Sequence, residues 1–346
     1  MRLSLRVILT VTVLVTAVFA GLLVVSFLRA TRQVIAVRPA EGGAEQHITI
    51  ILPDDSDIFF LALAEGGRQA ARQQNAVLEF LYYGAMQDEA GLLLQQARWM
   101  QTDGVLVFLP EQNSFTREIG QLAAAGIPVI TLINDNPLSG RTAHLGFDAE
   151  GIARELVRLM LDDVDRRPQR WGLLIAAEDE GRTAWQAERM EAVIRNLLSG
   201  HRQIELLPTR SVAPGYFAGE QEAVRLLREH SEIAGIITAV PQALSGVVQG
   251  LIDQNRLGDV RVVGIDTGGG VSEAIQRGLL NGTIYRYPEQ VGRSGVELLL
   301  QALNDRPVGE YHDLAYTAID RHNIERFLSR MSDSMQADLQ RGGQDG

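Results

Sequence analysis

The chain has 346 residues, which is long enough for two domains of ordinary size with buried cores. Its 32 basic and 43 acidic residues give a net charge of −11, and no basic cluster stands out, so a nucleic-acid partner is not expected. The absence of cysteine excludes disulfides, thiolate metal sites and cysteine nucleophiles.

The first predicted element is an apolar stretch at residues 7–28, which carries no charge and lies between Arg6 and Arg29. A helix of this length spans about 33 Å, enough for the core of a bilayer. The residues that follow, from Arg29 to Arg32, make a poor signal-peptide cleavage site. We therefore predict an uncleaved transmembrane signal anchor, with a cleaved signal peptide as the alternative. Arginines on both flanks leave its orientation open.

A polar linker is predicted at residues 29–46, and from His47 short apolar runs alternate with amphipathic stretches. The strand-like runs are ITIILP, VLEFLYY, GVLVFLP, IPVITLI, WGLLIAA, IELLPT, GIITA and VRVVGID. Apolar strands separated by helices predict parallel sheets that are covered on both faces. Because these units are too many for one compact domain, we predict an α/β fold of two doubly wound lobes. Ligands bind such folds beyond the carboxyl ends of the strands.

Two predicted helices carry a clear apolar face. The first follows the run ITIILP and the second begins near Asp320, within a C-terminal helix and tail at residues 320–346. The apolar positions at helical spacing are Phe60, Leu63, Ala64, Gly67 and Ala71 in the first helix, and Ile324, Phe327, Leu328 and Met331 in the second.

Several motifs of known chemistry are missing. The stretch VVGIDTGGGVSEAIQRG, residues 262–278, runs from a strand through glycines into a helix, but it lacks the G-x-G-x-x-G spacing, and the chain has no lysine for a phosphate loop. Neither H-E-x-x-H nor G-x-S-x-G occurs, and the six histidines are scattered. We therefore predict no metal, no cofactor and no enzymatic activity.

Polar and aromatic residues follow two of the predicted strands. Asp57, Phe59 and Phe60 come after the first strand, and Asp266 follows the last. Each has an ordinary structural explanation: the acids can cap helices or turns, and the phenylalanines can pack in the core. Taken one at a time, these explanations are at least as good as a role in binding.

Taken together, these residues and the stretches around them indicate a resemblance to a known family. From His47 to about Tyr316 the chain resembles the ribose/galactose-type (type I) periplasmic binding proteins, two-lobed receptors that close on a sugar. The matching stretches are DSDIFFLALAEGG, AAAGIPVITLINDNPLSGRTAHLGFDAEGIA, TAWQAERMEAVI and VVGIDTGGGVSEAIQRGLLNGTIYRYPEQVG.

The resemblance implies one binding domain at residues 47–319 with a hinge of three crossings, near Asp148, Arg286 and Tyr316. Lobe 1 would comprise residues 47–149 and 287–314, and lobe 2 residues 150–286 and 315–319. The lobes would be extracytoplasmic, with residues 1–6 in the cytoplasm and the chain anchored as a single-pass protein of the cell membrane.

The resemblance also implies a binding site. Asp266 would accept hydrogen bonds from sugar hydroxyls, Phe59 and Phe60 would stack on the sugar ring, and Asp57 would make a polar contact. Asn134 follows the position of a further family acid. Trp185 could line the cleft, although a core tryptophan explains it equally well.

At other positions the chain departs from the family. Ile133 stands at the place of an acid, Ala187 at that of an arginine, Val240 and Pro241 at that of an Asn-Asp pair, and Arg286 at that of a glutamine near the hinge. Because polar groups orient such ligands, we expect weak or no binding of plain neutral pentoses and hexoses. A larger, more apolar or negatively charged sugar-like ligand, with Arg286 near it, is expected instead.

Four functions compete at this stage. The first is a membrane-anchored solute-binding protein that serves an ABC permease or a membrane sensor kinase. The second is a degenerate pair of lobes that contacts another protein without binding small sugars. A lac-repressor-type regulator would need a DNA-binding headpiece where this chain has its apolar stretch, and an enzyme would need reactive groups that the motifs do not supply.

Overall fold

The computed structural model describes most of the chain beyond the predicted anchor. The described ranges are 46–53, 58–84, 88–162, 164–179, 182–183, 185–213, 215–241, 243–265 and 271–331. The predicted transmembrane segment, residues 7–28, lies outside them, as do Asp57 and Asp266. Across the described ranges, no helix combines the length and the apolar character needed to cross a membrane.

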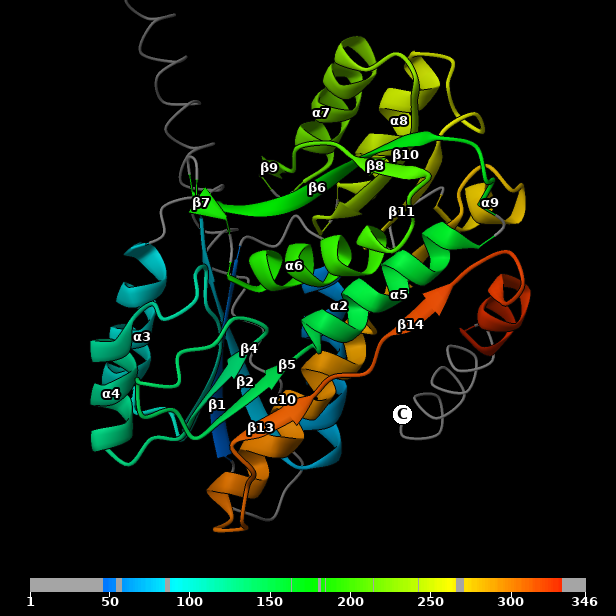
Figure 1. Cartoon of the computed structure of the whole chain (residues 1–346). Coiled ribbons are helices and arrows are strands. Elements are labelled where there is room, and N and C mark those ends of the chain that lie inside the picture. The colour runs from blue at the N-terminus through cyan, green and yellow to red at the C-terminus, as the bar shows by residue number, and fades with distance from the viewer. Residues whose placement is uncertain are drawn as a thin grey trace, which may run out of the picture.

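Two sheets form two lobes (Figure 1). The strands described in lobe 1 all pair in parallel, in the spatial order β13 (Tyr311–Asp313), β5 (Ala143–Gly146), β4 (Val129–Leu132), β3 (Gly104–Phe108), β1 (Gln46–Pro53) and β2 (Ala76–Tyr83).

The sheet of lobe 2 is mixed at its edges. Its described strands follow the order β14 (Thr317–Ile319), β12 (Gly282–Tyr285), β11 (Arg261–Ile265), β10 (Ile233–Ala239), β6 (Gln169–Asp179) and β7 (Arg182–Thr183), and β8 (Ile204–Leu206) and β9 (Arg210–Val212) also pair with β6. Only β14 and β7 pair antiparallel among these strands. The predicted α/β fold of two lobes with parallel sheets is therefore confirmed.

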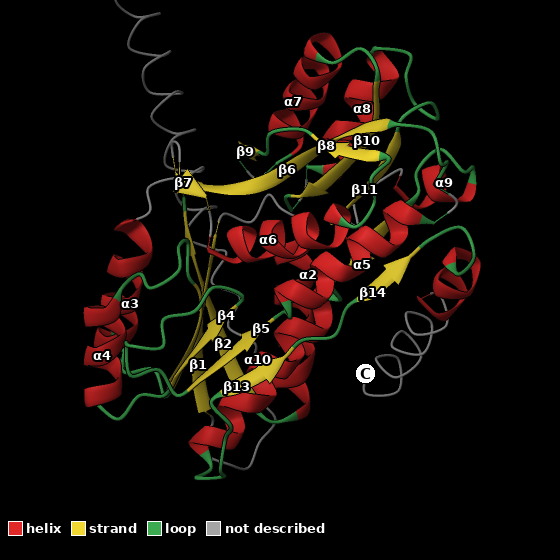
Figure 2. Cartoon of the chain, in the orientation of Figure 1, coloured by secondary structure: helices red, strands yellow, loops and turns green. Residues whose placement is uncertain are grey.

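Helices cover both faces of each sheet (Figure 2). In lobe 1, α2 (Ile58–Gln73) and α10 (Pro288–Leu303) cover one face, and α3 (Asp88–Trp99) and α4 (Thr116–Ala124) cover the other. In lobe 2, α5 (Ala149–Leu161) and α6 (Trp185–Ser199) lie opposite α7 (Tyr216–Glu229), α8 (Leu244–Asp253) and α9 (Val271–Gln276).

Successive residues of a central strand enter different cores. Ile50 of β1 packs with α2 and α10, whereas Ile51 packs with α3 and α4. In β6, Leu173 and Leu174 divide between the two cores of lobe 2 in the same way. Because both faces of each sheet are covered, both side-chain directions must be apolar, and this explains the continuous apolar runs.

Helices α2 and α10, which are far apart in sequence, lie side by side in lobe 1 (Figure 1). Their backbones approach closely at Gly66 and Gly292. A Cβ atom on Gly66 would lie 1.9 Å from the carbonyl oxygen of Glu289, and one on Gly292 would lie 1.9 Å from that of Leu63. These glycines allow the segment after the second passage to pack tightly on lobe 1.

The chain passes between the sheets three times. The passages lie between β5 and α5, between β12 and α10, and between β13 and β14. The hydroxyl oxygens of Tyr287, in the second passage, and Thr317, just after the third, are 2.7 Å apart. A helix at residues 324–331 then packs on lobe 2, with Ile324 buried and Phe327 against Tyr285.

Candidate functional site

Side chains from both lobes meet beyond the carboxyl ends of the strands, at what we call the inter-lobe boundary. We define it by Phe59, Ile133, Phe147, Gln186 and Arg286. Phe59 lies at the start of α2, Ile133 directly after β4, Phe147 directly after β5, Gln186 at the start of α6 and Arg286 directly after β12. Parallel sheets place such residues at a common edge, where ligands of doubly wound folds bind.

The two predicted stacking residues are buried. Phe59 is 6% exposed and Phe60 is 8% exposed, and both belong to the core of lobe 1. Their rings meet edge to face with centroids 5.4 Å apart, and the Phe60 ring meets that of Phe108 at 4.9 Å in the same manner. In this conformation the structure leaves little of either ring accessible.

Arg286 lies against two aromatic rings. Its guanidinium carbon is 4.6 Å from the centroid of the Phe59 ring and 5.6 Å from that of Phe147. Both distances are within the range of a cation–π interaction. Because Phe147 and Arg286 belong to the first and second passages, this cluster ties two passages to the first turn of α2.

Ile133 has an unusual backbone. Its φ is +66°, a left-handed value that is rare for a β-branched residue and costs on the order of 1–3 kcal/mol. The next amide, of Asn134, donates to the carbonyl of Leu132 at 2.8 Å and closes a tight turn. The side-chain amide of Asn134 donates to the carbonyl of Leu109 at 2.9 Å, so its nitrogen holds a neighbouring loop.

The turn at Ile133 exposes a carbonyl to lobe 2. Gln186 Nε2 donates to this oxygen at 2.7 Å, which joins α6 to the end of β4. Gln186 was not among the predicted site residues. The one signal for it in the sequence is its place in the stretch TAWQAERMEAVI, beside Trp185.

Two of the positions where the resemblance predicted polar groups carry buried apolar side chains. Ala187 is 3% exposed and Val240 is fully buried, each in a core of lobe 2. Trp185 is the first residue of α6, but its side chain, like Asp57 and Asp266, lies outside the described part. The structure therefore brings together Phe59, Phe60 and Arg286 of the predicted set, with Asn134 at the adjacent turn.

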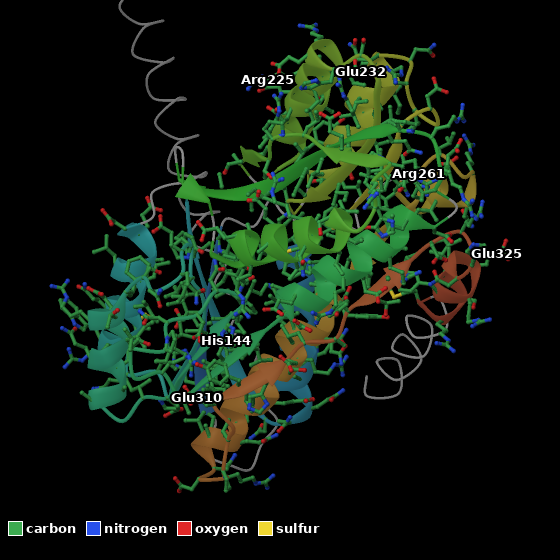
Figure 3. All side chains as sticks on the ribbon, viewed as in Figure 1. His144, Arg225, Glu232, Arg261, Glu310 and Glu325 are labelled. Carbon is green, nitrogen blue, oxygen red and sulfur yellow. The ribbon has the colours of Figure 1, made fainter. Side chains whose placement is uncertain are left out.

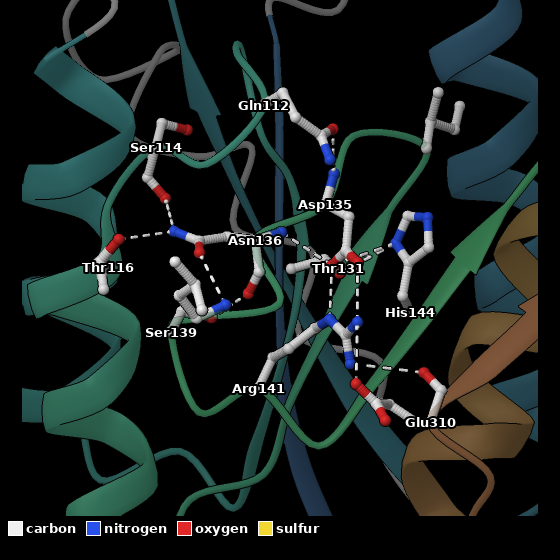
Figure 4. Close-up of polar contacts among 12 residues, drawn as sticks. Gln112, Ser114, Thr116, Thr131, Asp135, Asn136, Ser139, Arg141, His144 and Glu310 are labelled. Atoms are coloured by element: carbon white, nitrogen blue, oxygen red, sulfur yellow. Dashed lines mark hydrogen bonds and ion pairs between the residues drawn. The ribbon is translucent and has the colours of Figure 1, made fainter. Parts of the chain in front are cut away.

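A buried polar network lies behind this turn, in lobe 1 (Figure 4). Arg141 binds both carboxylate oxygens of Asp135, with the Nη2–Oδ2 distance at 2.7 Å, and Thr131 Oγ1 donates to Asp135 at 2.8 Å. Burial favours a raised pKa for Asp135, but the hydrogen bond from Arg141, the proximity of His144 and the bond from Thr131 outweigh it and lower this pKa.

The geometry of this network differs from a hydroxyl–imidazole–carboxylate relay. His144 uses one ring nitrogen, Nδ1, for both its neighbours: Thr131 Oγ1 at 3.0 Å and Asp135 Oδ1 at 3.6 Å. A relay from hydroxyl to base to carboxylate needs both ring nitrogens, and Thr131 is fully buried. Burial lowers the pKa of His144, which favours the neutral ring, although Asp135 opposes this.

Titratable side chains are spread over both lobes: Figure 3 shows His144 of the network and Glu310, which pairs with Arg141, on lobe 1, and Arg225, Glu232 and Arg261 on lobe 2. Within the described residues, no three His, Asp or Glu side chains are placed to hold a metal ion.

Three solved structures illustrate the likeness to known proteins. A glucose-galactose binding protein, GanP from Geobacillus stearothermophilus, is 17% identical with a TM-score of 0.72, covering 81% of this chain and 99% of its own. A periplasmic solute binding protein of an ABC transporter from Actinobacillus succinogenes, with bound D-allose, is 16% identical with a TM-score of 0.73, covering 82% and 100%. A XylFII–LytSN complex is 18% identical with a TM-score of 0.71, covering 81% and 99%.

At such low identity these structures show a shared fold. Among proteins with curated descriptions, none matches the sequence. A model of the periplasmic binding protein domain matches residues 48–307, which include most strands of both sheets and the first two passages between them, whereas β13 and β14 follow the matched range. The chain therefore belongs to the periplasmic binding protein domain family.

Proposed function

We propose that the chain is an extracytoplasmic solute-binding protein whose two lobes close on a carbohydrate-like ligand. The observation that carries this proposal is the inter-lobe boundary at the carboxyl ends of the strands. There Arg286 of the second passage lies against Phe59 of lobe 1, and Gln186 of lobe 2 donates to the carbonyl of Ile133 in lobe 1. Two lobes joined by short passages can open and close as a hinge around such a site.

Within this proposal, Asp266 and Asp57 hydrogen-bond the hydroxyls of the ligand, and Phe59, Phe60, Asn134, Trp185 and Arg286 line its site. The described departures narrow the ligand class. Because Ala187 and Val240 face the cores of lobe 2, they offer no polar contact. A larger, more apolar or negatively charged sugar therefore suits the site better than a plain pentose or hexose.

The ligand would be delivered to an ABC permease or reported to a membrane sensor kinase, with residues 7–28 as a membrane anchor. The similar structures support both routes: one is a binding protein of an ABC transporter, and another is a complex with a second protein, LytSN. No catalytic role is part of the proposal.

A thermal-shift panel with the purified full-length chain in detergent tests this function. Neutral sugars (D-ribose, D-xylose, D-glucose, D-galactose) would be compared with D-glucuronate, sugar phosphates and disaccharides. A ligand that binds the folded state stabilises it by about 2.7 kcal/mol at one hundred times Kd. We expect at least one charged or larger sugar to raise the Tm more than any neutral monosaccharide does.

Variants assign the effect to the site. Asp266→Ala should abolish the shift, whereas Asp165→Ala, at an exposed position of lobe 2, should retain it. Strong stabilisation by micromolar D-ribose, D-galactose or D-glucose would contradict the expected ligand class. An Asp266→Ala variant that folds normally and binds unchanged would contradict the role of that acid.

The second candidate function is a protein-interaction module that binds no small sugar. The burial of Phe59 and Phe60 and the apolar side chains at positions 187 and 240 favour it. If no carbohydrate of the thermal-shift panel raises the Tm, the result would support this second candidate and contradict the proposal of a carbohydrate-binding protein.

A further inference from the structure

The stacking surface at the inter-lobe boundary is already covered by the protein itself. The Arg286 guanidinium lies 4.6 Å from the centroid of the Phe59 ring, at the distance of a stacked group, and only 6% of Phe59 is exposed. Its neighbour Phe60 meets Phe59 edge to face and is itself covered by Phe108. Neither ring therefore offers a sugar the open face that stacking requires.

The position of Arg286 is determined by the fold. The residue lies directly after β12, where the chain passes from lobe 2 to lobe 1. The guanidinium carbon also lies 5.6 Å from the centroid of the Phe147 ring, which belongs to the first passage. A planar cation held near two rings is more strongly attached than one that touches a single exposed ring.

We propose that Arg286 is a specificity-determining residue that excludes neutral monosaccharides by occupying the stacking face of Phe59. This inference rests on the proposed function, because it concerns which sugars the inter-lobe boundary admits. A sugar stacks through its apolar C–H face, and a ring face covered by a guanidinium cannot accept it. A neutral sugar must first displace Arg286 and lose the cation–π contacts.

The test is to replace Arg286 by the glutamine expected at this position of the family. Affinities of wild type, Arg286→Gln and the control Arg167→Gln for D-ribose, D-xylose, D-glucose and D-galactose would be measured by calorimetry on the full-length chain. Arg167 is exposed and pairs with Asp165, so the control substitution removes the same positive charge at the surface of lobe 2. We expect Arg286→Gln to bind at least one of these sugars about tenfold tighter or more, and Arg167→Gln to match wild type.

A second measurement needs no change at Arg286. The ring current of Phe59 shifts the NMR signal of a stacked arginine Hε, so one such signal of the ligand-free protein should move when Phe59 is replaced by Leu. The absence of any arginine Hε signal that responds to Phe59→Leu would overturn the proposal even if Arg286→Gln does not fold.

The outcomes separate the two proposals. A wild type that binds a carbohydrate, together with an Arg286→Gln variant that binds neutral sugars no more tightly, overturns the exclusion and leaves the proposed function standing. If neither protein binds any carbohydrate, the proposed function fails and the exclusion fails with it. If the affinity for a neutral sugar rises in Arg286→Gln but not in Arg167→Gln, the result supports the proposal that Arg286 excludes neutral monosaccharides.

Discussion

The Asp135–Arg141 pair holds the loop between β4 and β5 from inside lobe 1. The side chain of Arg141 is 2% exposed and that of Asp135 is 7% exposed, and Thr131 and the backbone amide of Asn136 also donate to the carboxylate. A buried pair of this kind adds little net stability compared with apolar packing, but removal of Asp135 leaves the buried Arg141 with the longer ion pair to the exposed Glu310, at 3.6 Å.

We therefore expect Asp135→Asn to destabilise the protein by about 3 kcal/mol at pH 7, because the Arg141 guanidinium loses its buried carboxylate partner and keeps the longer ion pair to the exposed Glu310. The measurement is urea unfolding followed by circular dichroism. Glu65→Gln provides the matched control, since Glu65 pairs with Arg68 and Arg72 on the surface of α2, where exposed pairs contribute little. If both substitutions lower the free energy of unfolding equally, the buried pair contributes no more to stability than an exposed pair does.

The Asp135–Arg141 pair should also make the stability of the folded chain depend on pH. The pKa of Asp135 is lower in the folded chain than its ordinary value, so the folded state binds fewer protons here than the unfolded state does. The stability from this group is fully present above pH of about 4 and is lost as the pH falls through the lowered folded pKa. We expect the stability of Asp135→Asn to vary less than that of wild type over this acidic range.

At the scale of elements, the contact of α2 with α10 depends on the absence of side chains. A Cβ atom on Gly66 would lie 1.9 Å from the carbonyl oxygen of Glu289, and backbone atoms cannot move aside as a flexible side chain can. We expect Gly66→Ala to destabilise lobe 1 by about 1–3 kcal/mol through overpacking. Thermal unfolding would report this as a lower Tm.

The adjacent Gly67 supplies the control. A Cβ atom there would lie 3.4 Å from Ile50 and 3.6 Å from Leu78 and Val296, which is ordinary contact. Gly67→Ala should be neutral or stabilising by up to about 1 kcal/mol, since alanine favours a helix over glycine. If both substitutions lower the Tm equally, the close approach of α2 and α10 is not the cause.

The long elements could be predicted from sequence because each carries its own pattern. The run ITIILP is apolar throughout because Ile50 and Ile51 serve the two cores on opposite faces of β1. The short strands carry no such signal: β13 and β14 have three residues each, and their pairing with β5 and β12 comes from segments distant in the chain. Patterns of three residues do not distinguish a strand from a loop.

At the scale of the whole molecule, the sequence assigns candidate residues to helices and strands but does not show which of them touch. The motif DSDIFFLALAEGG places Phe59 in the first turn of a helix after a strand, and the structure begins α2 at Ile58. Arg286 covers this ring only because the fold brings together two residues that are more than 200 positions apart in the sequence. The same holds for Gln186 and Ile133, which meet across the boundary.

The hydrogen bond from Gln186 to the carbonyl of Ile133 leads to a prediction about the separation of the two lobes. It joins α6 to the end of β4 at 2.7 Å, so it is made when the lobes are in contact and is lost when they separate. A hydrogen bond of this kind contributes roughly 0.5–1.5 kcal/mol, which corresponds to a roughly two- to tenfold change in the ratio of closed to open molecules. We expect Gln186→Ala to shift ligand-free molecules toward the open state.

Because the chain contains no cysteine, this shift can be measured with spin labels at introduced cysteines. Trp99 on α3 is 82% exposed and Phe217 on α7 is 76% exposed, so Trp99→Cys with Phe217→Cys reports the distance between the lobes. Trp99→Cys with Leu138→Cys, at an 84% exposed site, reports a distance within lobe 1 and should not change. Gln186→Ala should raise the population at the longer inter-lobe distance. An unchanged distribution would show that this hydrogen bond does not hold the lobes together, and a change in the control pair would show that lobe 1 itself had been disturbed.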